Sequence, residues 1–166
     1  MRFRAEPEAA PPRKKLEDEI RQATPFASLE EEAFLALQRT ASLLLQAIGR
    51  ELKREDLTPA QYNLLRILRG AGGEALTCGE IAERLVSPGP DVTRLLDRLE
   101  GRQLVARERD PEDRRVVRAR ITAAGGALLA ALDAPVDLAL KRLLGHLGEG
   151  RLHQLSALLA SAREHV

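Results

Sequence analysis

The sequence has few aromatic residues and almost no cysteine. Its 166 residues include no Trp, one Tyr and three Phe. These four side chains are Phe3, Phe26, Phe34 and Tyr62. So few aromatic and β-branched residues, beside so many Leu and Ala, favour a mostly helical fold. The one cysteine, Cys78, excludes an internal disulfide and a cluster of thiol ligands for a metal.

Long hydrophobic runs are also missing. The longest unbroken apolar stretch, Ala127 to Leu132, is far shorter than the roughly 20 residues of a membrane-spanning helix. The segment from Met1 to Lys15 is polar and rich in proline, so it does not resemble a secretory signal. With 44% apolar and 31% charged residues, the composition indicates a soluble globular protein. We therefore expect a cytoplasmic protein with no membrane partner.

The basic residues are unevenly distributed, although the net charge is only +1. Between Arg84 and Arg120 the chain has ten Arg and no Lys, against seven acidic residues. Arg is favoured where a planar fork must meet phosphate or the edge of a base. A solvated surface in an Arg-rich protein would have the same composition, so charge alone leaves both interpretations open.

Helical patterns occupy both ends of the chain. Residues 1–12 lack a periodic apolar pattern and are expected to form a flexible tail, and Lys14 to Gln22 fits a short helix. Apolar residues at three- and four-residue steps predict a long helix from about Leu29 to Arg54. Thr122 should cap a second long helix, kinked at Pro135, and a last helix should run from Arg151 to about Glu164.

Three helix-start signals lie between these ends. Thr58-Pro59-Ala60-Gln61 and Thr77-Cys78-Gly79-Glu80 both have the spacing of a capping box. Ser87-Pro88 gives the third start, which leaves little more than Val86 and Ser87 as a connection, and the helix after it should end near Gly101. Three short helices with brief connections predict a helix-turn-helix.

The pattern then changes to that of a β-hairpin. Leu104 to Arg109 and Val116 to Ile121 are β-prone, and the turn-forming stretch Asp110 to Arg115 separates them. Four Arg follow within seven residues: Arg114, Arg115, Arg118 and Arg120. A hairpin buries little, so these side chains need an external partner, such as the narrow minor groove of DNA. Arg107 and Arg109, on the facing strand, are expected to contact the DNA backbone.

The third short helix has the two faces that a DNA recognition helix needs. Four apolar residues point inward: Val92, Leu95, Leu96 and Leu99. Arg94 and Asp97 then point outward, with Thr93 and Arg98 beside them. Arg94 can fork onto guanine, and Thr93 can contact a thymine methyl or a phosphate. Asp91 and Asp97 must each pair with an Arg or accept from cytosine, and for Asp97 we favour pairing. Taken alone, an exposed helix of mixed charge with no ligand explains the same pattern.

Four segments stand in a specific order and spacing: Leu57-Thr58-Pro59-Ala60-Gln61-Tyr62, Val92-Thr93-Arg94-Leu95-Leu96-Asp97-Arg98-Leu99-Glu100, Asp110 to Arg115, and Ile121-Thr122-Ala123-Ala124-Gly125. Together they resemble the MarR family of bacterial winged-helix regulators, over a region from about Leu29 to Leu159. The resemblance implies a homodimer that binds pseudo-palindromic operator DNA and usually represses transcription. It also implies that Arg115 is the minor-groove residue and that Asp113 orients it.

The chain departs from the family pattern at two places. The family often has Gly where Gln103 stands, and Pro88 with Pro90 makes the start of the recognition helix unusual. The candidate DNA-binding residues are Ser87, Thr93, Arg94, Arg98, Arg107, Arg109, Asp113, Arg114 and Arg115. The fold expected is mainly α with a small β-hairpin wing, a winged helix-turn-helix that dimerises through its long N- and C-terminal helices.

These expectations divide the chain into four parts. Residues 1–12 form the tail, 13–56 the N-terminal dimerisation helices, 57–122 the winged helix-turn-helix and 123–166 the C-terminal dimerisation helices. The outer helices carry more apolar surface than the winged domain can cover, so a second copy should bury the remainder.

Other functions have weaker support. The resemblance suggests a small aromatic or anionic effector, for which Tyr62, Arg66 and His146 are candidates by location, although Tyr62 also fits a core residue. Cys78 and the pair His146 and His153 are weak candidates for a redox switch and a metal site. No motif indicates an enzyme, a metal site or a cofactor. The alternative to a DNA-binding regulator is a dimeric winged-helix interaction protein that has lost DNA binding because Pro88, Pro90 and Asp91 spoil the helix start.

Overall fold

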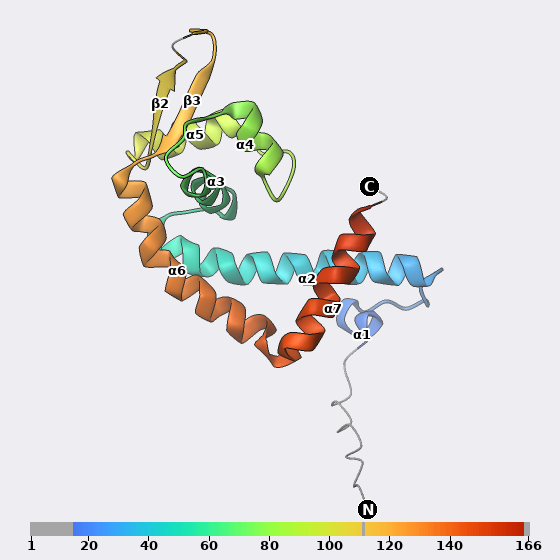
Figure 1. Ribbon diagram of the computed structural model, residues 1–166. Helices are drawn as coiled ribbons and strands as arrows, with labels where there is room; N and C mark the ends of the chain where they lie inside the picture. The colour runs from blue at the N-terminus through green and yellow to red at the C-terminus, as the bar shows by residue number, and fades with distance from the viewer. Residues whose placement is uncertain (1–14, 111, 165–166) are drawn as a thin grey trace, which may run out of the picture. The chain divides into compact units, whose positions relative to one another are not determined.

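The computed structural model describes residues 15–110 and 112–164, and these are mainly helical with one small sheet (Figure 1). The helices are α1 (Leu16–Ile20), α2 (Leu29–Leu52), α3 (Pro59–Gly70), α4 (Cys78–Arg84), α5 (Val92–Gly101), α6 (Ala123–Leu144) and α7 (Gly148–Arg163), with short 3₁₀ helices at Lys53–Glu55 and Gly145–Leu147. The strands are β1 (Leu76–Thr77), β2 (Val105–Arg109) and β3 (Val117–Ile121). The predicted helical fold with a hairpin wing is therefore confirmed. The predicted tail, residues 1–12, lies outside the described residues.

The chain divides into two compact units, and the boundary falls within α2. The first unit ends at Leu43, and in it α1 contacts α2 through an ion pair between Glu19 and Arg39, 3.7 Å apart. The second unit begins at Leu44 and contains the winged domain with α6 and α7. Its core is built mainly from Leu side chains, among them Leu52, Leu64, Leu65, Leu68, Leu96, Leu99 and Leu129.

Both predicted capping boxes are present. The hydroxyl of Thr58 accepts from the N–H of Gln61 at 3.2 Å, and the amide oxygen of Gln61 accepts from the N–H of Thr58 at 2.9 Å. Thr77 and Glu80 make the same reciprocal pair at the start of α4. Each box satisfies helix N–H groups that would otherwise lack a partner. Such signals are local, which is why four residues suffice to predict them.

The predicted start of the third short helix at Ser87 is wrong. α5 begins at Val92, and its N-cap is Asp91, whose carboxylate accepts from the N–H of Arg94 at 3.1 Å. Gly89 has φ of 108°, outside the helical region, and a residue that precedes proline disfavours helical geometry. Ser87-Pro88-Gly89-Pro90 is therefore a loop. The connection between α4 and α5 is longer than the two residues expected.

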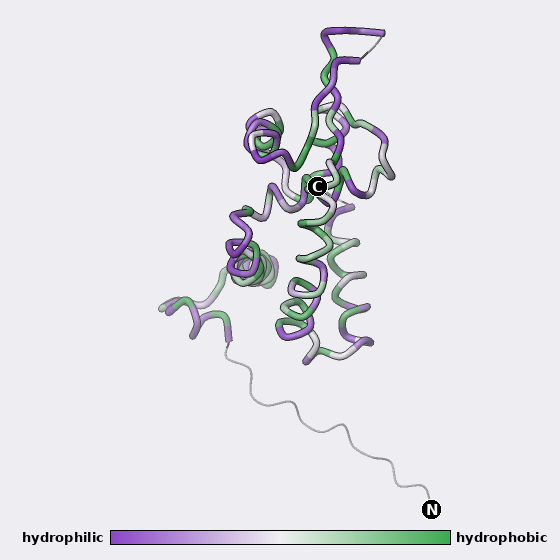
Figure 2. The backbone as a smooth tube through the Cα atoms, turned by 90° about the vertical axis from the view of Figure 1, so that its left-hand side faces the viewer, coloured by the Kyte–Doolittle hydropathy of each residue, from purple (hydrophilic) through white to green (hydrophobic). Residues whose placement is uncertain are grey.

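The sheet is antiparallel with strand order β1-β3-β2. Its hairpin pairs Val105 with Ile121 and Arg109 with Val117, and the hydrophilic tip of this wing is clear in Figure 2. β1 adds two residues on the other side of β3, where Leu76 pairs with Ala119. β1 is too short to be predicted from the sequence, because two residues carry no alternating pattern.

Gly125 allows the start of α6 to pack directly against the turn that follows α5. The hydroxyl of Thr122 caps α6 by accepting from the N–H of Gly125 at 3.0 Å, and it donates to the carbonyl of Gln103 at 2.7 Å. A Cβ atom at Gly125 would lie 2.2 Å from the carbonyl oxygen of Leu104. Gly125 is buried, so a side chain there has no free space.

The helical stretch Ala123–Arg163 is long and apolar enough to span a membrane by length and composition alone. Its most apolar 18-residue window has a mean hydropathy of 1.5 and is 28% buried. Core helices of globular proteins pass the same test. Here α6 buries Leu129, Leu132 and Val136 in the core, and the 3₁₀ helix Gly145–Leu147 separates α6 from α7. Core packing therefore accounts for part of this composition, and other apolar residues of the stretch, such as Leu138 and Leu158, are exposed.

We expect Gly125→Ala to lower the free energy of unfolding by about 1–3 kcal/mol, because the added methyl group overpacks a buried contact with backbone. Gly126→Ala is the matched control. Nothing lies within 4 Å of a Cβ at Gly126, so it should be neutral or stabilise α6 by up to about 1 kcal/mol. Chemical denaturation of both variants measures the difference, and equal stabilities would contradict the packing explanation.

Candidate nucleic-acid interface

One face of α5 is buried and the other is open to solvent. The buried residues are Val92, Leu95, Leu96 and Leu99. The exposed residues are Thr93, Arg94, Asp97 and Arg98. The predicted inward and outward faces are therefore confirmed. The polar face has the size and composition that a DNA major groove accepts, with two Arg and one Thr available to base edges or phosphates.

Arg107 binds to α5 rather than pointing away from the protein. Its Nη1 lies 2.7 Å from Oδ1 of Asp97, and its Nε donates to Oε2 of Glu100 at 2.8 Å. The same hydrogen bonds lower the pKa of the Glu100 carboxyl. The expected pairing of Asp97 with an Arg is thus confirmed, and its partner comes from the wing. Arg107 was expected to contact the DNA backbone, but the guanidinium of Arg107 already has two carboxylate partners within the protein.

The tip of the wing holds Arg115 in a fixed direction. Nε and Nη2 of Arg115 donate to the two carboxylate oxygens of Asp113 at 3.1 and 3.2 Å, and the N–H of Arg115 donates to the same carboxylate at 3.0 Å. The Arg115 side chain is nevertheless 91% exposed. These contacts also lower the pKa of Asp113. A charged side chain that is both oriented and exposed is ready to bind an anion.

A second carboxylate, Asp110, closes the wing turn from inside. It accepts from the N–H groups of Glu112 at 2.9 Å and Asp113 at 3.2 Å, and from Nε of Arg118. These donors, Arg118 above all, lower the pKa of Asp110 to about 2. Arg118 also donates to the carbonyl of Ala75 at 3.4 Å. The external partner predicted for Arg118 is thus replaced by an internal one, which the sequence pattern did not indicate because Asp110 lies eight residues away.

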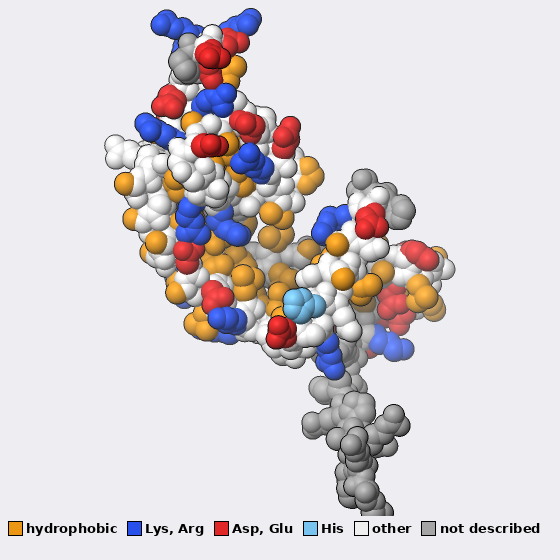
Figure 3. Space-filling view, in the orientation of Figure 1, with side chains coloured by type: hydrophobic (Ala, Val, Ile, Leu, Met, Phe, Trp, Pro, Cys, Tyr) orange, Lys and Arg blue, Asp and Glu red, His pale blue; other side chains and the backbone are white. Residues whose placement is uncertain are grey.

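The other predicted DNA-binding residues are exposed, but Ser87 lies outside the recognition helix that it was expected to begin. Arg94, Arg98, Arg109 and Arg114 are exposed, and among the described residues none of them has an ion-pair partner within 4 Å. Lys and Arg side chains are prominent at the wing tip in Figure 3. Ser87 is exposed but lies in the α4–α5 loop, away from the first turn of α5. The proline-rich loop ends before α5 begins, so it does not disrupt the helix as the alternative interpretation requires.

A partly apolar hollow of about 440 Å³ lies beside α3, and we call it the Tyr62 hollow. The guanidinium carbon of Arg66 lies 5.8 Å from the centre of the Tyr62 ring, a cation–π distance. The other lining residues are Leu45, Ile48, Leu52, Thr58, Pro59, Ala60, Asn63, Leu85, Val86, Ser87 and Pro90. Two predicted effector residues, Tyr62 and Arg66, are thus together. The third, His146, is not among the lining residues and lies exposed in the 3₁₀ helix after α6.

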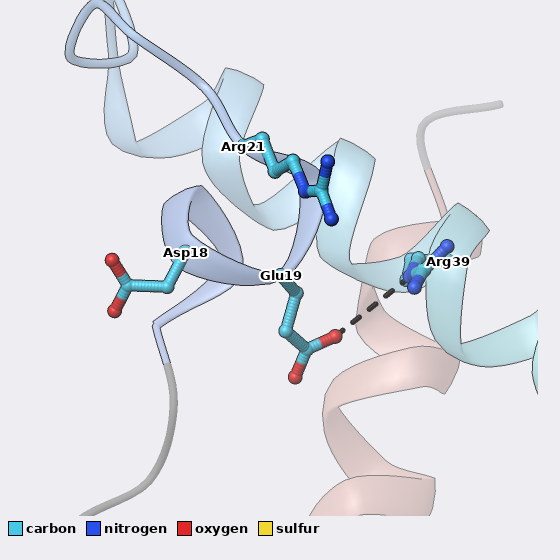
Figure 4. A pocket seen from close by; sticks show the side chains of 4 residues that line it. All are labelled: Asp18, Glu19, Arg21 and Arg39. Atoms are coloured by element: carbon cyan, nitrogen blue, oxygen red, sulfur yellow. Dashed lines mark ion pairs between the residues drawn. The ribbon is translucent and has the colours of Figure 1, made fainter.

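A more polar hollow, of about 700 Å³, lies in the first unit (Figure 4). Its lining residues are Asp18, Glu19, Arg21 and Arg39. Glu19 and Arg39 point toward one another, whereas Asp18 points away. Its two acidic and two basic side chains are exposed and their charges cancel, so the hollow attracts neither an anion nor a cation. It therefore does not support a binding site.

The weak candidates for a redox switch and a metal site, Cys78 and the pair His146 and His153, occupy ordinary positions on or next to helices. Cys78 is half-buried at the first position of α4. His153 lies 3.7 Å from Glu149 one helical turn away, and both side chains are exposed on α7. Among residues 15–110 and 112–164, no group of three or more His, Cys, Asp or Glu side chains is placed to hold a metal ion.

The chain is similar to known transcription factors over most of its length. The model of the MarR family matches residues 55–116. The transcriptional repressor MdtR of Bacillus subtilis (strain 168) is 32% identical over 133 residues, which cover 78% of this chain and 84% of MdtR. A MarR transcription factor from Planctomyces limnophilus is 43% identical, with 82% of this chain and 98% of that chain covered and a TM-score of 0.65. The MepR–DNA complex of S. aureus gives 26% identity, coverage of 80% and 96%, and a TM-score of 0.72.

Asp110→Asn should lower the melting temperature at neutral pH by an amount that disappears in acid. The folded protein holds the pKa of Asp110 at about 2, below its ordinary value of 3.8, so the ionised carboxylate stabilises the fold above pH 4. This contribution is lost as pH falls from about 4 to 2, because the carboxylate becomes protonated in both states. The difference in melting temperature between wild type and variant should therefore narrow between pH 4 and pH 3 and vanish only near pH 2.

Asp137→Asn, on the exposed face of α6, serves as the control for the Asp110 experiment. Asp137 makes only a surface ion pair with Lys141 on the same helix. Its loss should change the melting temperature little at any pH, since such pairs contribute about 0.3–0.5 kcal/mol. A gap between wild type and Asp110→Asn that stays constant down to pH 3 would contradict the proposed pairing of Asp110 with Arg118.

Proposed function

The chain belongs to the MarR family of DNA-binding transcriptional regulators, and we propose that it represses transcription by binding a pseudo-palindromic operator as a homodimer. Members of this family are regulators and not enzymes, as the sequence predicts. MepR, a relative of 26% identity, has been crystallised with DNA. We also propose a cytoplasmic location, where its DNA target would lie.

One observation carries the assignment of the interface: an exposed polar face of α5 lies next to a wing whose Arg115 is oriented but solvent-exposed. We assign Thr93, Arg94 and Arg98 to the major groove. Arg115, held by Asp113, enters the minor groove, where the narrow width of A·T-rich sequence concentrates negative potential. Arg109 and Arg114 contribute phosphate contacts. Arg107 is removed from this set because its guanidinium is paired with Asp97 and Glu100.

The outer helices carry the proposed dimer interface. Exposed large apolar residues occur on α2, α6 and α7. They are Leu29, Phe34, Leu37, Leu43, Leu45, Leu138, Leu140, Leu155 and Leu158. Apolar side chains in such numbers favour burial against a second copy of the chain. A two-fold dimer would place its recognition helices about 34–36 Å apart, one turn of DNA.

The Tyr62 hollow is the proposed effector site. It offers an aromatic ring, an Arg and apolar walls, which suit a small aromatic anion. Ser87 and Pro90, which line it, belong to the loop that leads into α5. An occupant therefore contacts the segment that sets where the recognition helix begins, and this connection makes DNA binding responsive to the effector.

Arg115→Ala should weaken binding to every duplex tested and leave the dimer intact. Gel shift on the region upstream of the protein's own gene, repeated at several salt concentrations, measures this. The plot of log affinity against log salt should become shallower, its slope decreasing in magnitude by about 0.9 if Arg115 neutralises one phosphate charge. Arg94→Ala should instead relax the preference at one base pair, worth about 1–3 kcal/mol.

Lys53→Ala, in the exposed 3₁₀ helix after α2, removes the same charge away from the interface and should bind as wild type does. Unchanged affinity in Arg115→Ala would exclude the wing from DNA binding. A loss in Arg94→Ala that is equal for all base substitutions would exclude Arg94 from base recognition. Failure of the wild type to select any duplex from a random library would overturn the proposed function itself.

A panel of benzoates and naphthoates should contain a compound that raises the melting temperature of the free protein and lowers its affinity for DNA. At about 100 times its dissociation constant, such a ligand adds about 2.7 kcal/mol of stability. Arg66→Ala should abolish the rise by removing the cation, whereas His146→Ala, outside the Tyr62 hollow, should retain it. An equal thermal shift in wild type and Arg66→Ala would place the effector elsewhere.

A further inference from the structure

Arg107 differs from the other basic residues of the interface because its guanidinium binds two carboxylates on another element and is largely withdrawn from solvent. Nη1 contacts Asp97, while Nε, Nη2 and the backbone N–H of Arg107 all donate to the Glu100 carboxylate. Its side chain is 26% exposed, against 91% for Arg115. Asp97 and Glu100 are three residues apart on one face of α5. One guanidinium on β2 therefore binds two successive turns of the recognition helix.

The outer part of the wing faces an open space near the starts of α4 and α5. A hollow of about 380 Å³ lies there, and its lining residues are Thr77, Cys78 and Gly79 at the start of α4, Thr93 of α5, and Arg107, Arg115, Val116 and Val117 of the wing. Close-packed side chains would fix the separation of two elements, but packing does not fill this region. Packing fixes the base of the wing, through buried Val105 and Ala119, but the separation of its outer part from the first turns of α5 needs another constraint.

The chain that links α5 to β2 is a tight turn. The N–H of Leu104 donates to the carbonyl of Leu99 at 3.0 Å, and that of Gln103 donates to Glu100 at 2.8 Å, with Gln103 at φ of 58°. This is the Schellman arrangement, in which the left-handed position favours Gly. The base of the wing is also held by buried Val105 and Ala119 and by the pairing of β3 with β1. Beyond this base, Arg107, three residues after Leu104, joins β2 directly to α5.

These ion pairs are placed to set geometry more than to stabilise the fold. The side chains of Asp97 and Glu100 are 56% and 38% exposed. Ion pairs so open to solvent contribute little to the free energy of unfolding. A bidentate, planar contact nevertheless restricts direction strongly, because both carboxylates must lie near the guanidinium plane.

We propose that Arg107 is a positioning residue that fixes the distance between α5 and the wing, and with it the spacing of the DNA sequences that the protein accepts. This inference rests on the proposed function, in which α5 enters the major groove and the wing enters the neighbouring minor groove. A fixed separation makes both contacts at once only when their base pairs are a set number of steps apart. Arg107 thus acts on specificity without touching DNA.

The first test needs no DNA. Spin labels are attached at Arg98→Cys on α5 and Arg114→Cys at the wing tip, in a Cys78→Ser background and in dimers diluted with unlabelled protein. Pulsed electron spin resonance should give a narrow distance distribution for this background and for Lys53→Ala. Arg107→Ala should broaden it, and Arg107→Lys should not restore it, because one ammonium group cannot bridge both carboxylates in the planar geometry. An unchanged width in Arg107→Ala would overturn the proposal.

The second test uses the duplex that the wild-type protein selects from a random library, with one base pair inserted or removed between the major-groove and minor-groove contacts. We expect the wild type to lose about tenfold or more in affinity on either change, as for a mismatched base pair. Arg107→Ala should discriminate among the three spacings by less than about threefold. Its salt slope should equal that of the wild type, whereas loss of a phosphate contact would lower the slope by about 0.9.

The outcomes separate the inference from the proposed function. Retained spacing preference in Arg107→Ala, or a lowered salt slope, would overturn the positioning role while DNA binding stands. Absence of any wild-type complex would overturn the proposed function, and the spin-label distances would still decide whether Arg107 positions the wing. Arg115→Ala serves as the contrast, because it should lose affinity on all spacings and also lower the slope.

Discussion

The burial of one face of α5 is the constraint on which the rest of the interface depends. Val92, Leu95, Leu96 and Leu99 are at most 9% exposed, so the rotation of the helix about its own axis is fixed. Only in that rotation do Arg94 and Arg98 face solvent while Asp97 and Glu100 face Arg107. Each buried Leu contributes about 1.5–3 kcal/mol, which is more than any of the exposed ion pairs. Apolar packing therefore orients the helix, and charge then positions the wing against it.

The arginines of the winged domain fall into two groups with different partners. Arg107 and Arg118 bind carboxylates of the protein and hold the wing in shape. Arg94, Arg109 and Arg115 project into solvent. Counting charges along the chain cannot separate these groups, because both types stand side by side on the same strands. What separates them is how far the protein withdraws the guanidinium from solvent: the side chains of Arg107 and Arg118 are 26% and 36% exposed, whereas Arg115 stays 91% exposed although it contacts Asp113.

Local signals made most of the fold predictable. The capping boxes, the hairpin and the buried face of α5 each depend on residues a few positions apart, and all three are confirmed. Non-local effects produced all of the errors except the start of α5. β1 exists only because it pairs with β3, more than forty residues further along the chain, and the roles of Arg107 and Arg118 depend on partners on other elements. The start of α5 was misplaced because Ser87-Pro88 imitates a helix start, while Gly89 lies outside helical geometry.

Salt affects the two groups of arginines differently. At physiological ionic strength the screening length is about 8 Å, so contacts as short as 2.7 Å between Arg107 and Asp97 are weakened little. Binding to DNA is weakened strongly, because each neutralised phosphate releases counterions. The salt dependence of the affinity therefore counts phosphate contacts and is insensitive to the pairs within the wing. A positioning residue and a phosphate-binding residue that look alike in sequence are thus distinguishable in solution, since only the second changes the slope.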